Sequence, residues 1–177
     1  IRIAYMFQNP RLLPWLTVLE NVEVVLSKEQ KSLNRAKDIL SIMGLKKFFN
    51  YYPSQLSGGM QRRVALARSY SSQPELFLLD EPFVSLDDQM ANKLRDMLVN
   101  LWAKEPTTII FVTHDLREAI YLADRIVFLS HAPSKVLLDK KINLKRPRKF
   151  DDNKIESLRK SIITKNKKIF IGEDVNV

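Results

Sequence analysis

Three short apolar runs, each four residues long, restrict the fold of this chain more than any other feature. They are Leu76–Leu79, Ile109–Val112 and Ile126–Leu129. A continuous apolar run of this length is too short for a helix of normal length. Such runs are typical of strands in a parallel sheet whose two faces are covered. The sequence therefore predicts at least three buried parallel strands.

Segments with helical spacing of apolar residues lie between the runs. The pattern covers 36–43, up to Gly44, and returns over 94–101, before Pro106. A strand-like run, Ile1–Phe7, opens the chain, and the stretch from there to about Ser72 is mostly helical in pattern. This order of elements predicts a layered α/β domain with a parallel sheet and a helical insertion.

Composition restricts where the protein works and what it can bind. The chain has no cysteine, which excludes disulfides and thiolate metal sites and fits a reducing compartment such as the cytoplasm. No stretch approaches the run of about 18 apolar residues that a membrane-spanning helix needs. The formal charge is +9, of which residues 135–177 supply +7, with 13 Lys or Arg against 6 Asp or Glu.

The basic tail has its own pattern of elements. We expect a strand at Val136–Leu138, then the proline-interrupted basic run Lys145–Lys149, then a helix over Asn153–Ile163. A basic tail can bind nucleic acid or an anionic bilayer, although a solvated helix with a charged face is the commoner explanation.

Two carboxylates follow the first of the apolar runs. Asp80 and Glu81 end the strand predicted over Leu76–Leu79. Ligands of α/β sheets bind outside the carboxyl ends of the strands, so the pair is well placed for a metal ion and a water molecule. Solvated turn residues are the alternative, and the pair alone does not separate the two.

Two further segments carry residues suited to anion binding. Ser57 is a good N-cap for a helix, and Gly58 and Gly59 after it allow backbone N–H groups to approach an anion. His114 follows the run that ends at Val112, which places an imidazole at the sheet edge expected for Asp80. A lone histidine there is more often packed or solvated than catalytic.

Together, five segments resemble the motifs of the ATP-binding cassette (ABC) family over nearly the whole of residues 1–134. They are Gln8, similar to the Q-loop; Leu56–Met60, similar to the LSGGM signature; Leu76–Asp80 with Glu81, similar to Walker B and its glutamate; Ser85–Asp87, similar to the D-loop; and His114, similar to the switch histidine. Any one motif is weak, but five in the family's order are specific. The resemblance implies a P-loop NTPase-like fold, with a partial nucleotide-binding domain at 1–134, a helical subdomain at about 12–72, and a tail at 135–177.

The resemblance also implies roles in hydrolysing ATP with Mg²⁺. Asp80 would hold Mg²⁺, Glu81 would act as general base for the attacking water, and His114 would contact the γ-phosphate. Gln8 would touch the metal or the water and report the nucleotide state to a membrane partner. The residues that would cap or bind nucleotide across a dimer, or couple its two sites, are Ser57, Gly58, Gly59, Gln61 and Asp87. Phosphoryl transfer needs mainly positioning and charge stabilisation, which such a set supplies.

The sequence departs from the family at its phosphate-binding loop. The loop G-x-x-x-x-G-K-[ST] precedes the Q-loop, but Gln8 is already within the first ten residues, and the only glycines are Gly44, Gly58, Gly59 and Gly172. Because the chain opens in mid-strand without Met, we expect an N-terminally incomplete sequence rather than a degenerate ATPase. We do not expect the chain as given to hydrolyse ATP.

Two segments resemble the nitrate, sulfonate and taurine importer branch of the family. These are 11–22, after the Q-loop, and Lys145–Arg148 with the basic helix that follows. The branch implies an integral-membrane permease, a second copy of the ATPase subunit, a periplasmic or lipoprotein solute-binding protein, and a place on the cytoplasmic face of a bacterial inner membrane. The cargo stays open, since related branches import thiamine-precursor pyrimidines. Leu12, Leu13 and Trp15 contact the permease or simply pack within the helical insertion.

Two other functions remain as alternatives. One is an ABC ATPase that acts on nucleic acid through the basic tail; such relatives carry long coiled coils or zinc-binding cysteines, which this sequence lacks. We therefore expect no nucleic-acid partner, and a salt-sensitive DNA-binding assay separates the two functions. The other is a regulatory remnant without enzymatic activity, which the missing loop permits.

Overall fold

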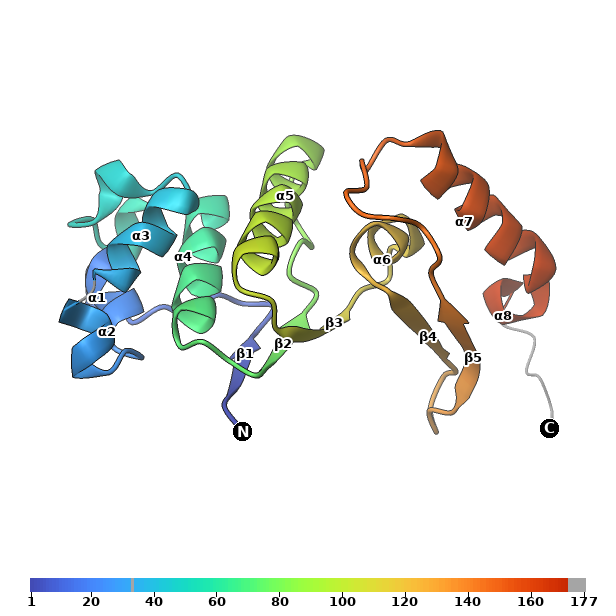
Figure 1. Cartoon of the computed structure of the whole chain (residues 1–177), viewed down its shortest axis with the longest axis horizontal. Coiled ribbons are helices and arrows are strands. Elements are labelled where there is room, and N and C mark those ends of the chain that lie inside the picture. The colour runs from blue at the N-terminus through green and yellow to red at the C-terminus, as the bar shows by residue number, and fades with distance from the viewer. Residues whose placement is uncertain (33, 172–177) are drawn as a thin grey trace. The chain divides into compact units, whose positions relative to one another are not determined.

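The computed structural model describes residues 1–32 and 34–171, and the chain divides into two compact units, Ile1–Val112 and Thr113–Val177 (Figure 1). Residues 172–177 of the basic tail, with Gly172, lie outside the described residues. The domain boundary expected after residue 134 stays a prediction.

A three-stranded parallel sheet forms the centre of the first unit. Its strands are β1 (Ile3–Met6), β2 (Leu76–Asp80) and β3 (Thr108–Val112), in the order β1-β2-β3. Met6 pairs with Leu79, and Asp80 with Val112, so the three strands end at one edge. The predicted α/β fold with a parallel sheet is confirmed.

Burial of this sheet is one-sided. Phe77 and Leu79 are buried on the face that α4 and α5 cover, whereas Ile110 and Val112 on the opposite face are 56% and 58% exposed (Figure 1). The prediction that the run Ile109–Val112 is buried is therefore wrong: Ile110 and Val112 are exposed, and Ile109 and Phe111 are only half-buried. The physical reason is that the described helices of this unit cover a single face.

The helical insertion lies between β1 and β2. Its elements are α1 (Val18–Glu23), α2 (Lys28–Ser32), α3 (Arg35–Ile42), the 3₁₀ turns Lys46–Phe48 and Pro53–Gln55, and α4 (Gly58–Ser71). Thr17 and Glu20 form a capping box at the start of α1. Gly44, just after the end of α3, has a φ of 69°, a conformation that glycine adopts readily. Both α1 and α3 pack on α4. The predicted helical insertion is confirmed.

Helix α5 (Asp88–Lys104) completes the first unit and confirms the helix predicted around 94–101. Tyr70 of α4 links three elements. Its ring packs edge-on against Phe77 of β2, with ring centroids 6.0 Å apart, and its hydroxyl donates to the carbonyl of Leu101 on α5 at 3.0 Å. The two helices and the strand end that carries Asp80 therefore belong to one packed core.

The second unit combines a strand pair with helices. Its elements are α6 (Leu116–Leu122), β4 (Arg125–Leu129), β5 (Val136–Lys141), α7 (Asn153–Lys165) and α8 (Lys167–Ile171). Ile120, Ile142, Ile155 and Ile162 are buried and form its core. The strand and the helix predicted in the tail are both confirmed. Among the described helices, none has the length and apolarity to cross a membrane.

The third apolar run is a strand, but its described partner is not parallel. β4 pairs with β5 in antiparallel fashion, from Arg125 with Lys141 to Leu129 with Val136. The connection between them, 130–135, is long enough for a hairpin and too short for the crossover that parallel strands need. Val127 and Leu129 are 46% and 61% exposed, so the prediction of a buried parallel strand is wrong here.

Candidate functional site

The carboxylate of Asp80 lies at the end of β2, on the exposed face of the sheet. Tyr5 of β1 donates its hydroxyl to Asp80 Oδ2 at 3.2 Å. Desolvation, this hydrogen bond and the negative charge of Asp80 together raise the pKa of the Tyr5 phenol. The sequence did not single out Tyr5, although strand alternation and parallel pairing place it on the same face as Asp80.

Glu81 contacts Gln8 directly beyond the strand ends. Gln8 Nε2 donates to Glu81 Oε2 at 3.2 Å, across 73 positions of sequence. The backbone N–H of Glu81 donates to the carbonyl of Val112 at 3.1 Å, which holds the residue against the end of β3. Its φ of 42° lies in the left-handed region, where a residue with a side chain is strained. The structure thus brings together Gln8, Asp80 and Glu81, three of the predicted site residues.

Arg62 of α4 fixes the turn after Glu81. Its Nη1 donates to the carbonyls of Pro82, at 3.4 Å, and of Val84. Burial lowers the pKa of this guanidinium. Sequence reasoning missed this residue because a contact between positions 62 and 84 leaves no local pattern.

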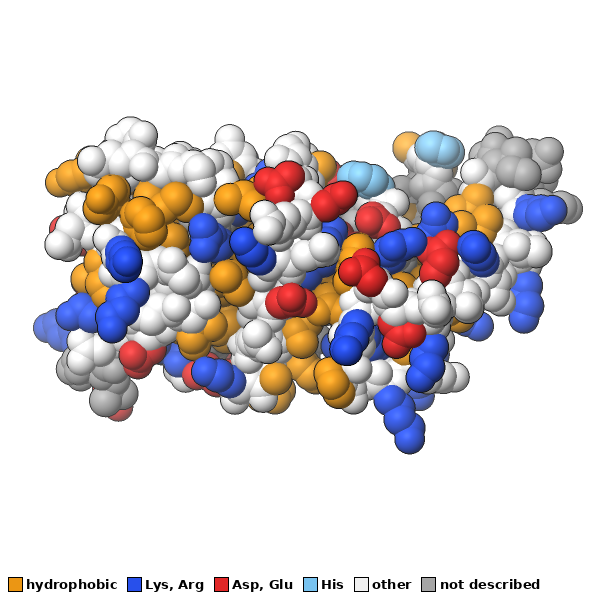
Figure 2. All heavy atoms as spheres, turned by 90° about the horizontal axis from the view of Figure 1, so that it is seen from above, with side chains coloured by type: hydrophobic (Ala, Val, Ile, Leu, Met, Phe, Trp, Pro, Cys, Tyr) orange, Lys and Arg blue, Asp and Glu red, His pale blue; other side chains and the backbone are white. Residues whose placement is uncertain are grey.

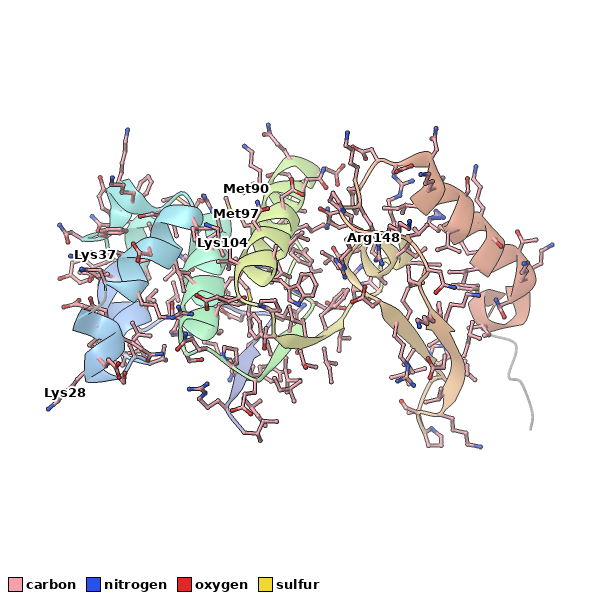
Figure 3. The ribbon with its side chains drawn as sticks, viewed as in Figure 1. Lys28, Lys37, Met90, Met97, Lys104 and Arg148 are labelled. Carbon is pink, nitrogen blue, oxygen red and sulfur yellow. The ribbon has the colours of Figure 1, made fainter. Side chains whose placement is uncertain are left out.

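The predicted signature segment begins α4. Ser57 is the N-cap, and its Oγ accepts from the N–H of Met60 at 3.3 Å. A Cβ added at Gly58 would meet no atom of the described residues within 4 Å, whereas a Cβ at Gly59 would lie 2.4 Å from the sulfur of Met90, labelled on α5 in Figure 3. Gly58 therefore borders open space, and Gly59 permits the close approach of the two helix starts.

Gln61 and Asp87 are both engaged in local structure. The amide of Gln61 donates to the carbonyls of Pro53, at 2.9 Å, and Leu56, at 3.4 Å, and so holds the turn before α4. Asp87 is the N-cap of α5 and accepts from the N–H of Met90 at 2.8 Å. Their roles toward nucleotide stay predictions.

His114 belongs to the second unit, two residues after the end of β3. It stands between Thr113, whose hydroxyl accepts from the N–H of Asp115 at 3.1 Å, and Asp115, which is the N-cap of α6. The Asp115 carboxylate accepts from the N–H groups of Arg117, at 2.8 Å, and Glu118, at 3.4 Å. These bonds fix the backbone on which His114 is carried.

The oxygen ligands at the strand ends suit Mg²⁺, which takes only some of its ligands from the protein, better than a metal ion whose ligands are all protein side chains. Within residues 1–32 and 34–171 there is no cluster of three or more His, Cys, Asp or Glu side chains arranged to hold a metal ion. Mg²⁺ commonly binds through one or two carboxylates, with water and substrate phosphates completing its shell. Asp80, a single carboxylate at the strand end, fits that pattern.

Comparison with known proteins agrees with the motifs found in the sequence. Residues 1–84 match the family model described as ABC transporter. An uncharacterized ABC transporter ATP-binding protein of Methanocaldococcus jannaschii is 45% identical over 163 residues, 89% of this chain and 60% of that protein. The aliphatic sulfonates import ATP-binding protein SsuB of Bacillus cereus is 42% identical, over 90% of this chain and 64% of the relative. The chain thus spans less than two thirds of the length of these relatives.

A solved structure agrees with the sequence relatives. The ATP-binding cassette MJ0796, in a dimeric post-hydrolysis state with ADP and Pi, has a TM-score of 0.68 and 34% sequence identity, covering 81% of this chain and 64% of that one. With the motifs, the parallel sheet and these relatives in agreement, residues 1–84 carry the ABC transporter family domain, and the chain as a whole is similar to ATP-binding proteins of that family.

Proposed function

We propose that this chain is a large part of the motor subunit of an ABC importer, and that the complete subunit hydrolyses ATP with Mg²⁺. The observation that carries the proposal is the hydrogen bond between Gln8 and Glu81, directly beside Asp80 at the carboxyl end of a parallel sheet. ATP hydrolysis needs a carboxylate that binds the metal ion, a carboxylate that accepts a proton from water, and a polar group that contacts them, and Asp80, Glu81 and Gln8 are such groups.

Each residue has a role in this proposal. Asp80 offers an oxygen ligand to Mg²⁺, which when bound neutralises charge on the phosphates. Glu81 accepts a proton from the attacking water, and Gln8 sets the direction of its carboxylate through their hydrogen bond. His114 contacts the γ-phosphate. The phosphate-binding loop that completes the ATP site has no counterpart in the 177 residues, so activity belongs to a subunit that contains it.

The test is the substitution Glu81→Gln in the full-length subunit. Loss of the proton acceptor should lower turnover by about 100-fold or more, with binding of ATP retained. The measurements are steady-state release of phosphate and binding of a fluorescent ATP analogue. Glu75→Gln is the matched control, because Glu75 lies at the opposite end of β2, where it accepts from the N–H of Arg2. Wild-type turnover in the Glu81 variant would remove the general base from the proposal.

We also propose that two subunits bind ATP between them. Ser57, Gly58 and Gly59 then cap the γ-phosphate held by the other subunit, with Gln61 nearby, and Asp87 couples the two sites. Support comes from the open space beside Gly58 at the start of a 14-residue helix, since N-terminal N–H groups of a helix favour an anion. The similar cassette MJ0796 is dimeric in its solved structure.

The segment after Gln8 is a suitable docking surface for the permease. It is a loop held at both ends: Arg68 donates to the carbonyls of Pro10 and Arg11, at 3.0 and 3.1 Å, and the buried Asn21 donates to the carbonyl of Leu13 at 3.0 Å. Asn21 also donates to the carbonyl of Leu16 at 2.9 Å, and Trp15, between the held carbonyls of Leu13 and Leu16, is 69% exposed. A held loop with an exposed large aromatic side chain suits contact with a partner better than internal packing.

Trp15→Glu tests the docking surface. We expect co-purification with the permease and transport to fall, while the ATPase rate of the isolated subunit stays within about twofold, because an exposed side chain contributes little to folding. Leu13→Glu should act in the same direction with some loss of stability, since Leu13 is half-buried. Val24→Glu, at the far end of α1 and 53% exposed, is the control. If Trp15→Glu unfolds the subunit instead, the segment serves packing.

For cargo, we propose aliphatic sulfonates, ahead of nitrate and taurine, because relatives at 37–42% identity carry that name. The permease and a periplasmic or lipoprotein solute-binding protein would select the cargo, with this subunit on the cytoplasmic face of the membrane. Deletion of the gene should abolish growth on alkanesulfonates as sole sulfur source while sparing growth on sulfate. Growth that is unaffected would point to another solute.

Our proposal includes no nucleic-acid partner. Arg146 and Arg148 of the basic run bond backbone carbonyls of the second unit, and on the face that Figure 2 shows, acidic and basic side chains are interspersed. An exposed patch of one sign is the usual footprint of a nucleic-acid surface.

A further inference from the structure

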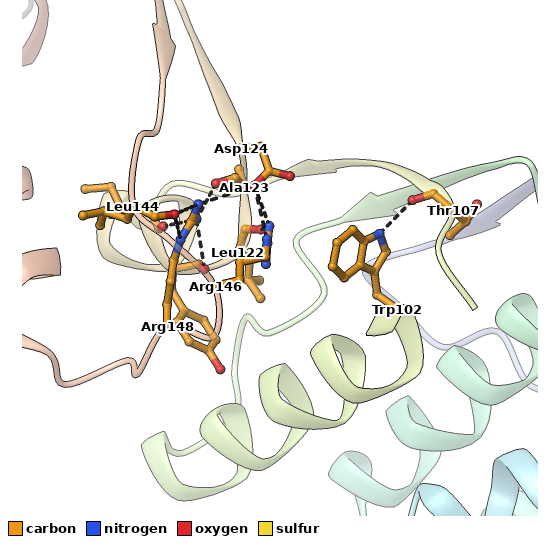
Figure 4. Close-up of polar contacts among 10 residues, drawn as sticks. Trp102, Thr107, Leu122, Ala123, Asp124, Leu144, Arg146 and Arg148 are labelled. Atoms are coloured by element: carbon orange, nitrogen blue, oxygen red, sulfur yellow. Dashed lines mark hydrogen bonds and ion pairs between the residues drawn. The ribbon is translucent and has the colours of Figure 1, made fainter. Parts of the chain in front are cut away.

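The side chain of Arg148 is buried within the second unit, with only 4% of it exposed. Its Nη1 donates to the carbonyls of Ile120, Tyr121 and Ala123, at 2.8, 3.3 and 2.5 Å (Figure 4). Its Nε and Nη2 donate to the carbonyl of Leu144, at 3.1 and 2.9 Å, which joins the same guanidinium to the tail segment. Arg148 thus caps the C-terminal end of α6.

Arg146 completes the cap. It donates to the carbonyl of Leu122 and to Asp124 Oδ1, the latter at 3.0 Å. The two arginines therefore supply donors to four consecutive carbonyls, those of 120–123. The last four carbonyls of a helix have no partner within it, and a cation at this end also interacts favourably with the helix dipole. We call Arg146 and Arg148 the arginine clamp.

The other end of α6 carries His114. The helix has only seven residues, and helices this short have little stability of their own, so their ends must be held by tertiary contacts. Arg117 on α6 donates to Glu156 of α7 at 2.6 Å, and Tyr121 packs edge-on against Phe150 at 5.6 Å. The clamp and these contacts together fix the position of α6 within its unit.

We propose that Arg148, assisted by Arg146, is a positioning residue for His114. The clamp fixes the axial position and orientation of α6, and α6 fixes the imidazole that precedes its N-cap. The inference rests on the proposed function, in which His114 contacts the γ-phosphate. A misplacement of about 1 Å at a reacting group can reduce catalysis by about 100-fold, so a clamp remote from the chemistry can control the rate.

A double-mutant cycle in the full-length subunit tests the clamp. Arg148→Gln should lower kcat by about tenfold or more, with KM for ATP changed by less than about twofold, because only transition-state contacts are disturbed. In a His114→Ala background the same substitution should have no further effect on kcat, because both substitutions remove the same contribution, that of a correctly positioned His114. The proposal would be overturned if the loss of kcat in the double variant equalled the product of the two single losses. It would also be overturned if a folded Arg148→Gln subunit kept its kcat.

Two further variants keep the cycle decisive. If Arg148→Gln yields no folded subunit, the same cycle is measured with Arg148→Lys and Arg146→Gln, which keep part of the clamp. Each should lower kcat by a smaller factor, and neither should lower it further in the His114→Ala background. Lys149→Gln is the matched control. It removes an exposed cation next to the clamp and should leave kcat unchanged. A loss as large as that of Arg148→Gln would assign the effect to charge rather than to the clamp.

Proton NMR of the histidines gives a readout independent of activity. The chain has two, and His131, in the β4–β5 connection, serves as internal reference for His114. The clamp variants should shift the His114 imidazole resonance and leave that of His131 in place. A fixed His114 resonance would overturn the positioning role. If instead the wild-type subunit hydrolyses no ATP, or His114→Ala is fully active, the proposed function fails, while the resonance still reports on the clamp.

Discussion

The backbone of Glu81 has a φ of 42°, in the left-handed region that L-residues enter at a cost of about 1–2 kcal/mol. Two contacts hold it there, the bond from its N–H to Val112 and the bond from Gln8 to its carboxylate. Strain of this kind persists only where surrounding structure determines the conformation, and it is frequent at functional sites. The left-handed backbone of Glu81 lowers the stability of the fold and directs the Glu81 carboxylate toward Gln8.

Comparing Glu81→Gly with Glu81→Ala measures that strain. Both variants lose the bond to Gln8, and only glycine adopts the left-handed conformation without strain. We therefore expect the glycine variant to be more stable than the alanine variant by about 1 kcal/mol in urea unfolding. Equal stabilities, or a more stable alanine variant, would contradict the strained backbone. Both variants should lack turnover in the complete subunit.

At the scale of elements, one guanidinium joins three helices of the first unit. Arg35 on α3 donates through Nε to the carbonyl of Ser71, at the end of α4, at 2.8 Å. Its two terminal nitrogens donate to both oxygens of Glu105, after α5, at 2.9 and 2.6 Å. A bidentate pair of this geometry fixes orientation as well as distance. The helical insertion is therefore fastened to the end of α5.

Acid should loosen this junction. The hydrogen bond from Arg35 lowers the pKa of Glu105, so its stabilising contribution is present above the ordinary glutamate pKa and is lost as pH falls through the lowered value. We expect Glu105→Gln to cost about 1 kcal/mol or less at pH 7, and nothing once both states are protonated. Urea unfolding from pH 7 to pH 3 measures this, with Glu23→Gln as control. A cost that grows on acidification would contradict the assigned pair.

Periodicity predicted the helices and strands well, because the spacing of apolar residues is a local property of sequence. The helices around 36–43, 94–101 and 153–163 all form. Pairing is different: β4 was expected in a parallel sheet, and its described partner is the antiparallel β5. The strand pattern predicts that a segment is extended, but it contains no information about which neighbour pairs with it or about which of its faces is covered.

The site divides in the same way. The sequence analysis expected His114 at the sheet edge of Asp80 and gave Gln8 a role at the same site; the structure shows the bond from Gln8 to Glu81, and the roles of these residues stay predictions. Arg62 and Arg148 were not predicted to bond distant carbonyls, because a guanidinium that satisfies backbone groups 22 or 28 positions away leaves no spacing rule in the sequence. The left-handed backbone of Glu81 is likewise a tertiary effect.

At the scale of the whole molecule, the open space beside Gly58 allows dimerisation to be separated from folding. No atom of the described residues lies within 4 Å of a Cβ added at position 58, so Gly58→Phe should fold normally. It should nevertheless prevent ATP-dependent dimerisation of the Glu81→Gln subunit, measured by size-exclusion chromatography with light scattering. Gly58→Ala is the small-residue control. A dimer that survives Gly58→Phe would move the interface away from the start of α4.

The bare face of the three-stranded sheet has a practical consequence for the 177-residue chain in solution. Ile3, Tyr5, Ile110 and Val112 are all more than 40% exposed, and together they give water an apolar surface that ordinary monomers keep covered. Such a surface adsorbs hydrophobic dyes, is recognised by chaperones, and draws copies of the chain together as concentration rises. We therefore expect this polypeptide by itself to associate as its concentration rises, which light scattering at a series of concentrations measures.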